Sequence, residues 1–200
     1  MNHIETILFL PTLISINKIT KHPNYGRLFF HSLLTFFSIY EIYNNKLYFL
    51  NELNTLYEYN YYGNKCNIIA LQYFLYDLKY IYKKKQYLLH HIIFINAILY
   101  SFYFNKYSKI TIYMGLHEIS SIFLDLKLLN IYPEISSKCF YSTFLFIRIS
   151  SLPIITYYIF YIDYFIFTIF CINCFLHICW LYTSLTLKKN TKIHILNKNY

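Results

Sequence analysis

Ionisable side chains lie inside two consecutive apolar stretches of this chain. The first stretch begins with His90-His91, and the second carries His117, Glu118, Ser121, Asp125 and Lys127. Bilayer hydrocarbon disfavours each ionisable residue by about 2.5–3.5 kcal/mol on insertion scales, so such residues usually face a bundle interior or a wet cavity. The pattern predicts a polar site enclosed between membrane helices.

A histidine pair near a carboxylate can support several kinds of chemistry. One histidine can act as a general base or as an acyl-accepting nucleophile, with Glu118 orienting it. Histidines and carboxylates can also bind a divalent metal, but no second half of a zinc motif follows Cys171-x-x-Cys174. We expect no metal and no bound cofactor. One alternative to catalysis is a polar network that fixes helix packing, and another is that His90-His91 lie at the cytosolic interface beside Lys83–Lys85.

The second stretch places its polar residues on one side of a helix. At 3.6 residues per turn, positions 117, 118, 121 and 125 fall within a stripe of roughly 100°. We therefore expect His117, Glu118, Ser121 and Asp125 to share one face, with Ser120 off that stripe. The candidate catalytic residues are His90, His91, His117 and Glu118.

Other polar residues inside apolar stretches are candidates for supporting roles. Arg148 is expected to form a structural ion pair with Glu118, Asp125 or Asp77, and Pro153 is expected to kink its helix. Asp77 can take part in the site or in a salt bridge at the membrane interface. Asn173 can bridge helices by hydrogen bonds. His31 and His177 are interpreted as packing residues.

Composition places the chain in a membrane. Of its 200 residues, 57% are hydrophobic and only 14% are charged, whereas soluble domains average about 25% charged residues. The net charge of +9 resides in lysines between apolar stretches, so it indicates topology and not nucleic-acid binding. We expect membrane lipids as partners, and the sequence does not identify a protein partner.

Six apolar stretches are long enough to be candidate membrane spans: residues 28–43, 66–82, 87–104, 110–129, 139–162 and 164–187. Only Asp163 separates the last two, which suggests a tight helical hairpin. Residues 1–23 form an N-terminal segment, expected to be interfacial or the stub of a further helix because Pro11 interrupts a short apolar stretch. Residues 24–190 form the membrane domain and residues 191–200 a cytosolic tail, with the chain fraying after Leu187.

Lysine and arginine distribution predicts the orientation of these spans. Thirteen Lys and Arg residues fall on the side of the N-terminus and four on the opposite side, with Arg148 inside a span. Positive residues favour the cytosolic side of a membrane. An even number of spans with both termini in the cytosol is therefore expected.

Motifs in order along the chain resemble the TLC-domain family, which contains TRAM, ceramide synthase and their relatives. The resemblance covers roughly residues 24–190. It rests on the following segments: Asn24-Tyr25-Gly26-Arg27, Tyr73-Phe74-Leu75-Tyr76-Asp77, His90-His91, Ser101-Phe102-Tyr103-Phe104-Asn105, His117-Glu118-Ile119-Ser120-Ser121, Phe146-Ile147-Arg148-Ile149, and Asn173 with Trp180. The resemblance implies an all-α protein, a barrel of about six transmembrane helices around a lipid-accessible cavity.

One departure bears on function. Ceramide synthases carry H-D-x-x-D, whereas this chain has His117-Glu118-x-x-Ser121 and lacks the second acid. This is more similar to the non-synthase TLC branch, which is associated with lipid homeostasis or protein trafficking. The resemblance implies an endoplasmic reticulum or related endomembrane protein that handles acyl chains and influences lipid composition. The alternatives are an N-acyltransferase that uses acyl-CoA, and a membrane cargo receptor or assembly factor.

Overall fold

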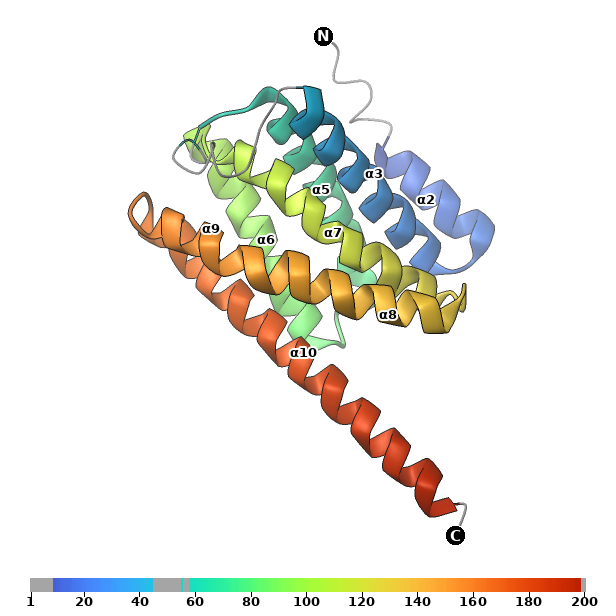
Figure 1. Ribbon diagram of the computed structural model, residues 1–200. Coiled ribbons are helices and arrows are strands. Elements are labelled where there is room, and N and C mark those ends of the chain that lie inside the picture. The colour runs from blue at the N-terminus through green and yellow to red at the C-terminus, as the bar shows by residue number, and fades with distance from the viewer. Residues whose placement is uncertain (1–8, 45–54, 56–57, 199–200) are drawn as a thin grey trace.

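The computed structural model describes residues 9–44, 55 and 58–198, with side chains up to residue 183. All regular elements in these ranges are helical: α2 (Phe9–Thr20), α3 (Pro23–Asn44), α5 (Tyr61–Ile81), α6 (Lys85–Phe104), α7 (Ser108–Leu128), α8 (Pro133–Thr143), the π-helix η2 (Phe144–Ile149), α9 (Ser150–Phe160) and α10 (Tyr164–Lys198). Elements α8, η2 and α9 run on as one helix (Figure 1). The prediction of an all-α fold is confirmed, and every predicted span lies within or largely within one of these helices.

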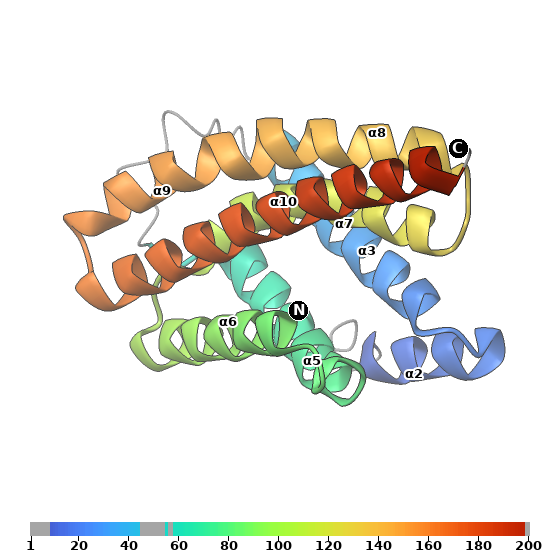
Figure 2. The ribbon, with the colours of Figure 1, turned by 90° about the horizontal axis from the view of Figure 1, so that it is seen from below.

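The six long helices close into a ring. In order around the ring, α3 contacts α7, α7 contacts α8, α9 contacts α10, α10 contacts α6, α6 contacts α5, and α5 returns to α3. Figure 2, seen from below, shows α10 running diagonally between the α8–α9 helix and α6. A closed ring lets each helix turn its polar residues inward, away from lipid.

Three of the described helices are long and apolar enough to cross a bilayer by length and composition: Lys85–Phe104, Pro133–Phe160 and Tyr164–Thr183. The other long helices are more polar because they bury polar residues in the ring. These include Glu41 in α3 and Asn67 in α5, both about 1% exposed. Large apolar side chains such as Phe146, 80% exposed, and Phe175, 65% exposed, point outward. Polar side chains inside the ring and large apolar side chains on its outer surface are typical of a protein surrounded by lipid.

The N-terminal segment forms a helix that packs against the ring. In α2, Leu13 is fully buried, and Asn17 accepts a hydrogen bond from the Gly26 N–H and donates one to Tyr76. Pro11 does not interrupt α2 because it occupies the first turn, where a proline leaves no intrahelical bond unmade. At 12 residues, or roughly 18 Å, α2 is too short to cross a bilayer by itself.

The last helix is longer than the sequence predicts. The chain was expected to fray after Leu187, but α10 continues to Lys198 and extends beyond the ring (Figure 1). Residues 164–198 contain neither glycine nor proline, so no residue in this segment forces the helix to end.

The helix that carries Arg148 changes geometry just before Pro153. Residues 144–149 form a π-helix, and Pro153 lies inside α9 without a backbone N–H to bond the Ile149 carbonyl. The missing hydrogen bond, to the Ile149 carbonyl, lies where the π-helix ends and α9 begins. The helix therefore departs from α geometry in the turn before Pro153; the kink expected at Pro153 stays a prediction. Such π-helical segments are frequent at functional sites.

Asp163 forms the hairpin between α9 and α10, as the sequence suggests. Its Oδ2 atom accepts hydrogen bonds from the Tyr100 and Tyr107 hydroxyls, both at 2.7 Å, and its Oδ1 atom caps α10 at the Phe165 and Ile166 N–H groups. Burial raises the pKa of Asp163, but these hydrogen bonds outweigh burial and leave that pKa below its usual value. The carboxylate thus fastens α10 to the α6–α7 end of the ring.

Gly63 permits the closest approach of two helices at the same end of the ring. A Cβ atom at Gly63 would lie 2.0 Å from the backbone oxygen of Ser108. The two helix starts are also bonded, since the Ser108 hydroxyl accepts from the Asn60 N–H at 2.7 Å and donates to the Asn60 carbonyl at 3.0 Å. Close approach through a small residue is a common way of packing membrane helices.

Gly63→Ala is expected to destabilise the ring by about 3 kcal/mol, because the new methyl group meets backbone that cannot rotate away. Thermal unfolding of the purified protein in one fixed detergent measures this effect. Asn64→Ala, one residue further along α5, is the matched control and is expected to unfold near the wild-type temperature. Equal melting of Gly63→Ala and wild type would show that α5 and α7 do not meet here.

Candidate functional site

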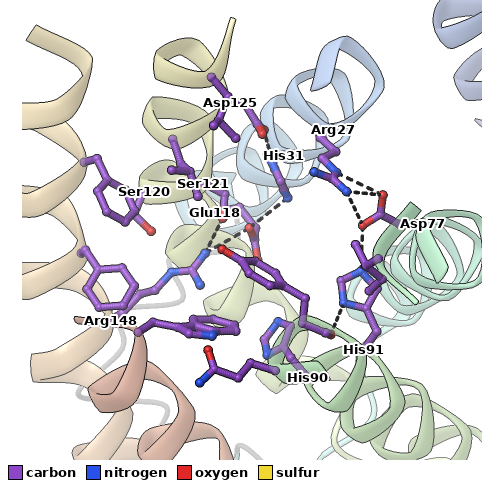
Figure 3. A pocket seen from close by; sticks show the side chains of 18 of the residues that line it. Arg27, His31, Asp77, His90, His91, Glu118, Ser120, Ser121, Asp125 and Arg148 are labelled. Carbon is purple, nitrogen blue, oxygen red and sulfur yellow. Dashed lines mark hydrogen bonds and ion pairs between the residues drawn. The ribbon is translucent and has the colours of Figure 1, made fainter. Parts of the chain in front are cut away.

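A cavity of about 350 Å³ opens at one end of the ring, between the start of α3, the end of α5, the start of α6 and the end of α7. Side chains from α8 and α10 complete its wall. Figure 3 shows charged and polar side chains converging on it from different helices. The charged and polar residues of the cavity wall include Arg27, His31, Asp77, Lys84, His90, His91, Glu118, Ser120, Ser121, Asp125, Lys127 and Arg148.

Asp77 joins α3, α5 and α6 on one side of the cavity. Its carboxylate accepts from the Arg27 guanidinium at 3.0–3.3 Å and lies 3.2 Å from His91 Nε2. The other ring nitrogen of His91 lies 3.1 Å from the Tyr87 carbonyl oxygen. His91 is therefore held in one orientation by contacts at both nitrogens.

His31 lies between two carboxylates on α7. Its Nδ1 atom is 2.6 Å from Asp125 Oδ2, and its Nε2 atom is 3.5 Å from Glu118 Oε2. Carboxylates accept hydrogen bonds, so this geometry accommodates a proton on each ring nitrogen. His31 thus links α3 to α7 across the wall of the cavity (Figure 3).

Arg148 connects the π-helix to α7 and α10. Its guanidinium donates to Glu118 at 3.2 Å, to the Ser121 hydroxyl at 2.5 Å, to the His117 carbonyl oxygen at 3.0 Å and to His177 Nε2 at 2.9 Å. His177 Nδ1 must carry the proton because it faces the Asn173 carbonyl at 2.7 Å. The ion pair expected for Arg148 therefore exists, with Glu118 as its partner.

His90 differs from His91 in having a free polar atom. Its Nδ1 atom is buried and lacks a hydrogen-bond partner among the described residues, as does Trp180 Nε1. The His90 ring lies 5.1 Å from Trp180 and 6.0 Å from His177, measured between centroids. Both His90 and Trp180 line the cavity, and these two nitrogens are the buried polar atoms of its wall that lack a partner among the described residues.

His117 and Ser120 do not lie where the sequence stripe puts them. Glu118, Ser121 and Asp125 line the cavity, but His117 does not belong to its wall; its Nε2 atom contacts the Ser151 hydroxyl at 2.7 Å. Ser120, expected off the stripe, lines the cavity instead. All the wall residues of α7 lie from Glu118 onward, so His117 lies just beyond the inner end of the cavity, where Ser151 of α9 contacts its ring nitrogen.

Asn173 lies where the sequence suggests a bridge between helices. The residue is 1% exposed, and its amide side chain interacts with His90 of α6, although it does not reach the geometry of a regular hydrogen bond. Its backbone carbonyl lies 2.7 Å from His177 Nδ1. His177 and Arg148 form a stronger bridge at this depth.

Sequence reasoning misses Arg27 and His31 as site residues. The sequence predicts Arg27 only as one of the positive charges on the side of the N-terminus and His31 as a packing residue, yet both contact carboxylates in the cavity wall. A signal was present, because positions 27 and 31 lie one helical turn apart and so share a face. Their carboxylate partners lie 50 and 94 residues away, beyond the reach of any local pattern.

A second, smaller cavity of about 70 Å³ adjoins the first. The two share Phe74 and Glu118 in their walls. The rest of the second wall is mostly apolar and includes Ala70, Ala97 and Phe170. The interior therefore has a charged compartment at the end of the ring where Lys84 and Lys127 lie. It has a mostly apolar compartment nearer the α9–α10 hairpin.

This arrangement can hold a polar group beside His90 and an apolar chain beyond Phe74. A neutral imidazole with a free ring nitrogen can accept a proton or attack an acyl carbon. Glu118 is engaged by Arg148 and His31, which suits it to positioning. Within the described residues, no cluster of three His, Cys, Asp or Glu side chains has a geometry for a metal ion.

Comparison with known proteins identifies the family. The model of the TLC domain, shared by TRAM, LAG1 and CLN8 proteins, matches residues 24–187, which is most of the chain and contains the whole cavity wall. Comparisons with curated proteins and with solved structures found no match. The family is one of helical membrane proteins connected with lipid metabolism. This chain is therefore an integral membrane protein that belongs to the TLC-domain family.

Proposed function

We propose that the ring binds the acyl chain of a membrane lipid and that the protein thereby influences membrane lipid composition. The observation that carries this proposal is the pair of adjacent cavities, one charged and one mostly apolar, which share Phe74 and Glu118 in their walls. Their order matches an amphiphile with its head at the ring end and its chain inside. At about 350 Å³, the larger cavity falls within the usual range of roughly 300–1,000 Å³ for ligand sites.

The charge pattern supports an orientation for this site. The cavity opens at the end of the ring that carries Arg27, Lys84 and Lys127, and positive residues favour the cytosolic face. We propose that the cavity opens to the cytosol, with both termini on that side, in the endoplasmic reticulum or a related endomembrane. We also propose that the protein belongs to the non-synthase branch of the family.

A second candidate function is N-acyl transfer from acyl-CoA to a long-chain amine. His90 favours it, because this residue lines the cavity with a free Nδ1 atom. The engagement of Glu118 with Arg148 favours binding over turnover, since an ion-paired carboxylate is a poor proton acceptor.

Purified protein in lipid nanodiscs separates the two functions. The protein is incubated with radiolabelled palmitoyl-CoA and sphinganine, and in parallel with a radiolabelled fatty acid alone. We expect saturable retention of the acyl chain without N-acyl product. Product that disappears in His90→Ala while the folded protein persists would establish the transferase. Absence of both retention and product would reject the lipid-binding proposal.

A further inference from the structure

Every carboxylate in the wall of the larger cavity already has a basic partner. Asp77 contacts Arg27 at 3.0 Å, Asp125 contacts His31 at 2.6 Å, and Glu118 contacts Arg148 at 3.2 Å. These contacts use all three wall carboxylates. The lysines and arginines of the wall (Arg27, Lys84, Lys127 and Arg148) outnumber these carboxylates by one, so the wall carries surplus positive charge even when His31 is neutral.

Two such cations lie at the rim. Lys84 and Lys127 line the cavity from α6 and α7, and neither forms an ion pair within the described part of the chain. Each ammonium instead lies over a tyrosine ring, Lys84 at 5.7 Å from Tyr87 and Lys127 at 6.0 Å from Tyr141. Such contacts are weak at exposed positions, so both ammonium groups can engage an anion.

The start of α6 adds hydrogen-bond donors at the same rim. Lys84 is the residue that precedes this 20-residue helix, and no side chain caps its first turn. Gln86 and Tyr87, both in that turn, line the cavity. The first N–H groups of a helix lack intrahelical partners and favour anions. Trp180 Nε1, buried in the wall without a partner, is a further donor.

We propose that this rim binds the phosphate of a single-chain phospholipid. The phosphate oxygens take bonds from Lys84, Lys127 and the first turn of α6, and the acyl chain passes Phe74 into the smaller cavity. A phosphate suits the rim because it presents several acceptor oxygens to donors that approach from different helices. This proposal rests on the proposed function, since it assigns the headgroup of the same lipid.

The lone tryptophan of the chain reports on this site directly. Trp180 is the only Trp in the sequence and lies in the cavity wall. Full-length protein in phosphatidylcholine nanodiscs is titrated with 1-oleoyl lysophosphatidic acid, with 1-oleoyl glycerol, with oleate and with inorganic phosphate, and Trp180 emission is followed. The two glycerolipids share one chain and differ by the phosphate.

We expect the lysophospholipid to bind at least about tenfold more tightly than 1-oleoyl glycerol or oleate. Lys84→Gln/Lys127→Gln is expected to weaken its binding about tenfold and to leave 1-oleoyl glycerol unchanged. The control Lys83→Gln/Lys138→Gln removes the same charge from positions outside the cavity wall and should behave as wild type.

Equal affinities for the lysophospholipid and 1-oleoyl glycerol, or for the lysophospholipid and oleate, would overturn the phosphate assignment and leave acyl binding intact. If Lys84→Gln/Lys127→Gln bound the lysophospholipid as tightly as wild type, the assignment of these two lysines to the phosphate would be overturned. Saturation of the site by inorganic phosphate at lysophospholipid concentrations would mean a free-phosphate site and overturn the proposal. If no oleoyl compound binds, the proposed function itself fails.

Discussion

Replacing Arg148 by methionine is expected to cost about 3–5 kcal/mol of stability, the usual effect of removing one partner from a buried ion pair. Arg148 is only 5% exposed and donates to Glu118, Ser121, the His117 carbonyl oxygen and His177. Without the guanidinium, Glu118 keeps the 3.5 Å contact to His31 and its interaction with the Ser121 hydroxyl, but it loses its ion pair. A carboxylate left in that position lacks the compensation that made its burial tolerable.

The design that tests this includes a rescue. Arg148→Met/Glu118→Leu removes both charges and is expected to recover much of the lost stability, since apolar replacements of buried ion pairs are often neutral. Lys127→Met is the matched control, because it deletes a cation from the half-exposed rim. Thermal unfolding in one detergent compares all four proteins. If Arg148→Met melts like Lys127→Met, Arg148 is not the structural centre of the ring.

Filling the smaller cavity is expected to make the protein discriminate against long acyl chains. Ala97 lies in its wall, and Ala97→Phe places a ring where the end of the chain would run. Displacing about four methylene groups costs about 3 kcal/mol at ~0.8 kcal/mol each, or about a hundredfold in affinity. An eight-carbon chain, which stays within the larger cavity, should bind as before.

Trp180 emission measures the affinities of both chain lengths for this variant. Leu99→Phe is the matched control, because Leu99 lies two residues away on α6 and is 49% exposed. It adds an aromatic ring on the outer face and should change neither affinity. Equal loss of short and long chains in Ala97→Phe would mean that the variant has distorted the site, and unchanged binding would remove the smaller cavity from the account.

The sequence was sufficient for the helices because their signal is local. Apolar length marked α6, α9 and α10, and the single polar break at Asp163 marked the hairpin between the last two. The length of α10 was underestimated because a polar composition after Leu187 was read as an end, although no helix-breaking residue is present. The bounds of α3 and α5 were also short, because their polar first turns fall outside an apolar window.

The sequence predicts many of the residues that form the site but not the contacts between them. The residues His90, His91, Glu118, Asp125 and Arg148 were identified because an ionisable group in an apolar stretch is expensive. Which residues meet depends on the depth at which the helices pack against one another, and His117 lies at the depth of Ser151 and outside the cavity wall. The pairing of Asp77 with Arg27, across 50 residues, follows from ring closure and not from any spacing in the sequence.

The inner compartment as an acyl-chain site is the central claim, and photocrosslinking in native membranes tests it most directly. Cells expressing the protein are fed a fatty acid with a diazirine near its terminal methyl group, and labelled peptides are mapped after irradiation. The account predicts labelling of inward residues such as Ala70, Ala97 and Phe170, and loss of that labelling in Ala97→Phe. Labels confined to outward residues such as Phe146 and Phe175, with none inside the ring, would contradict it.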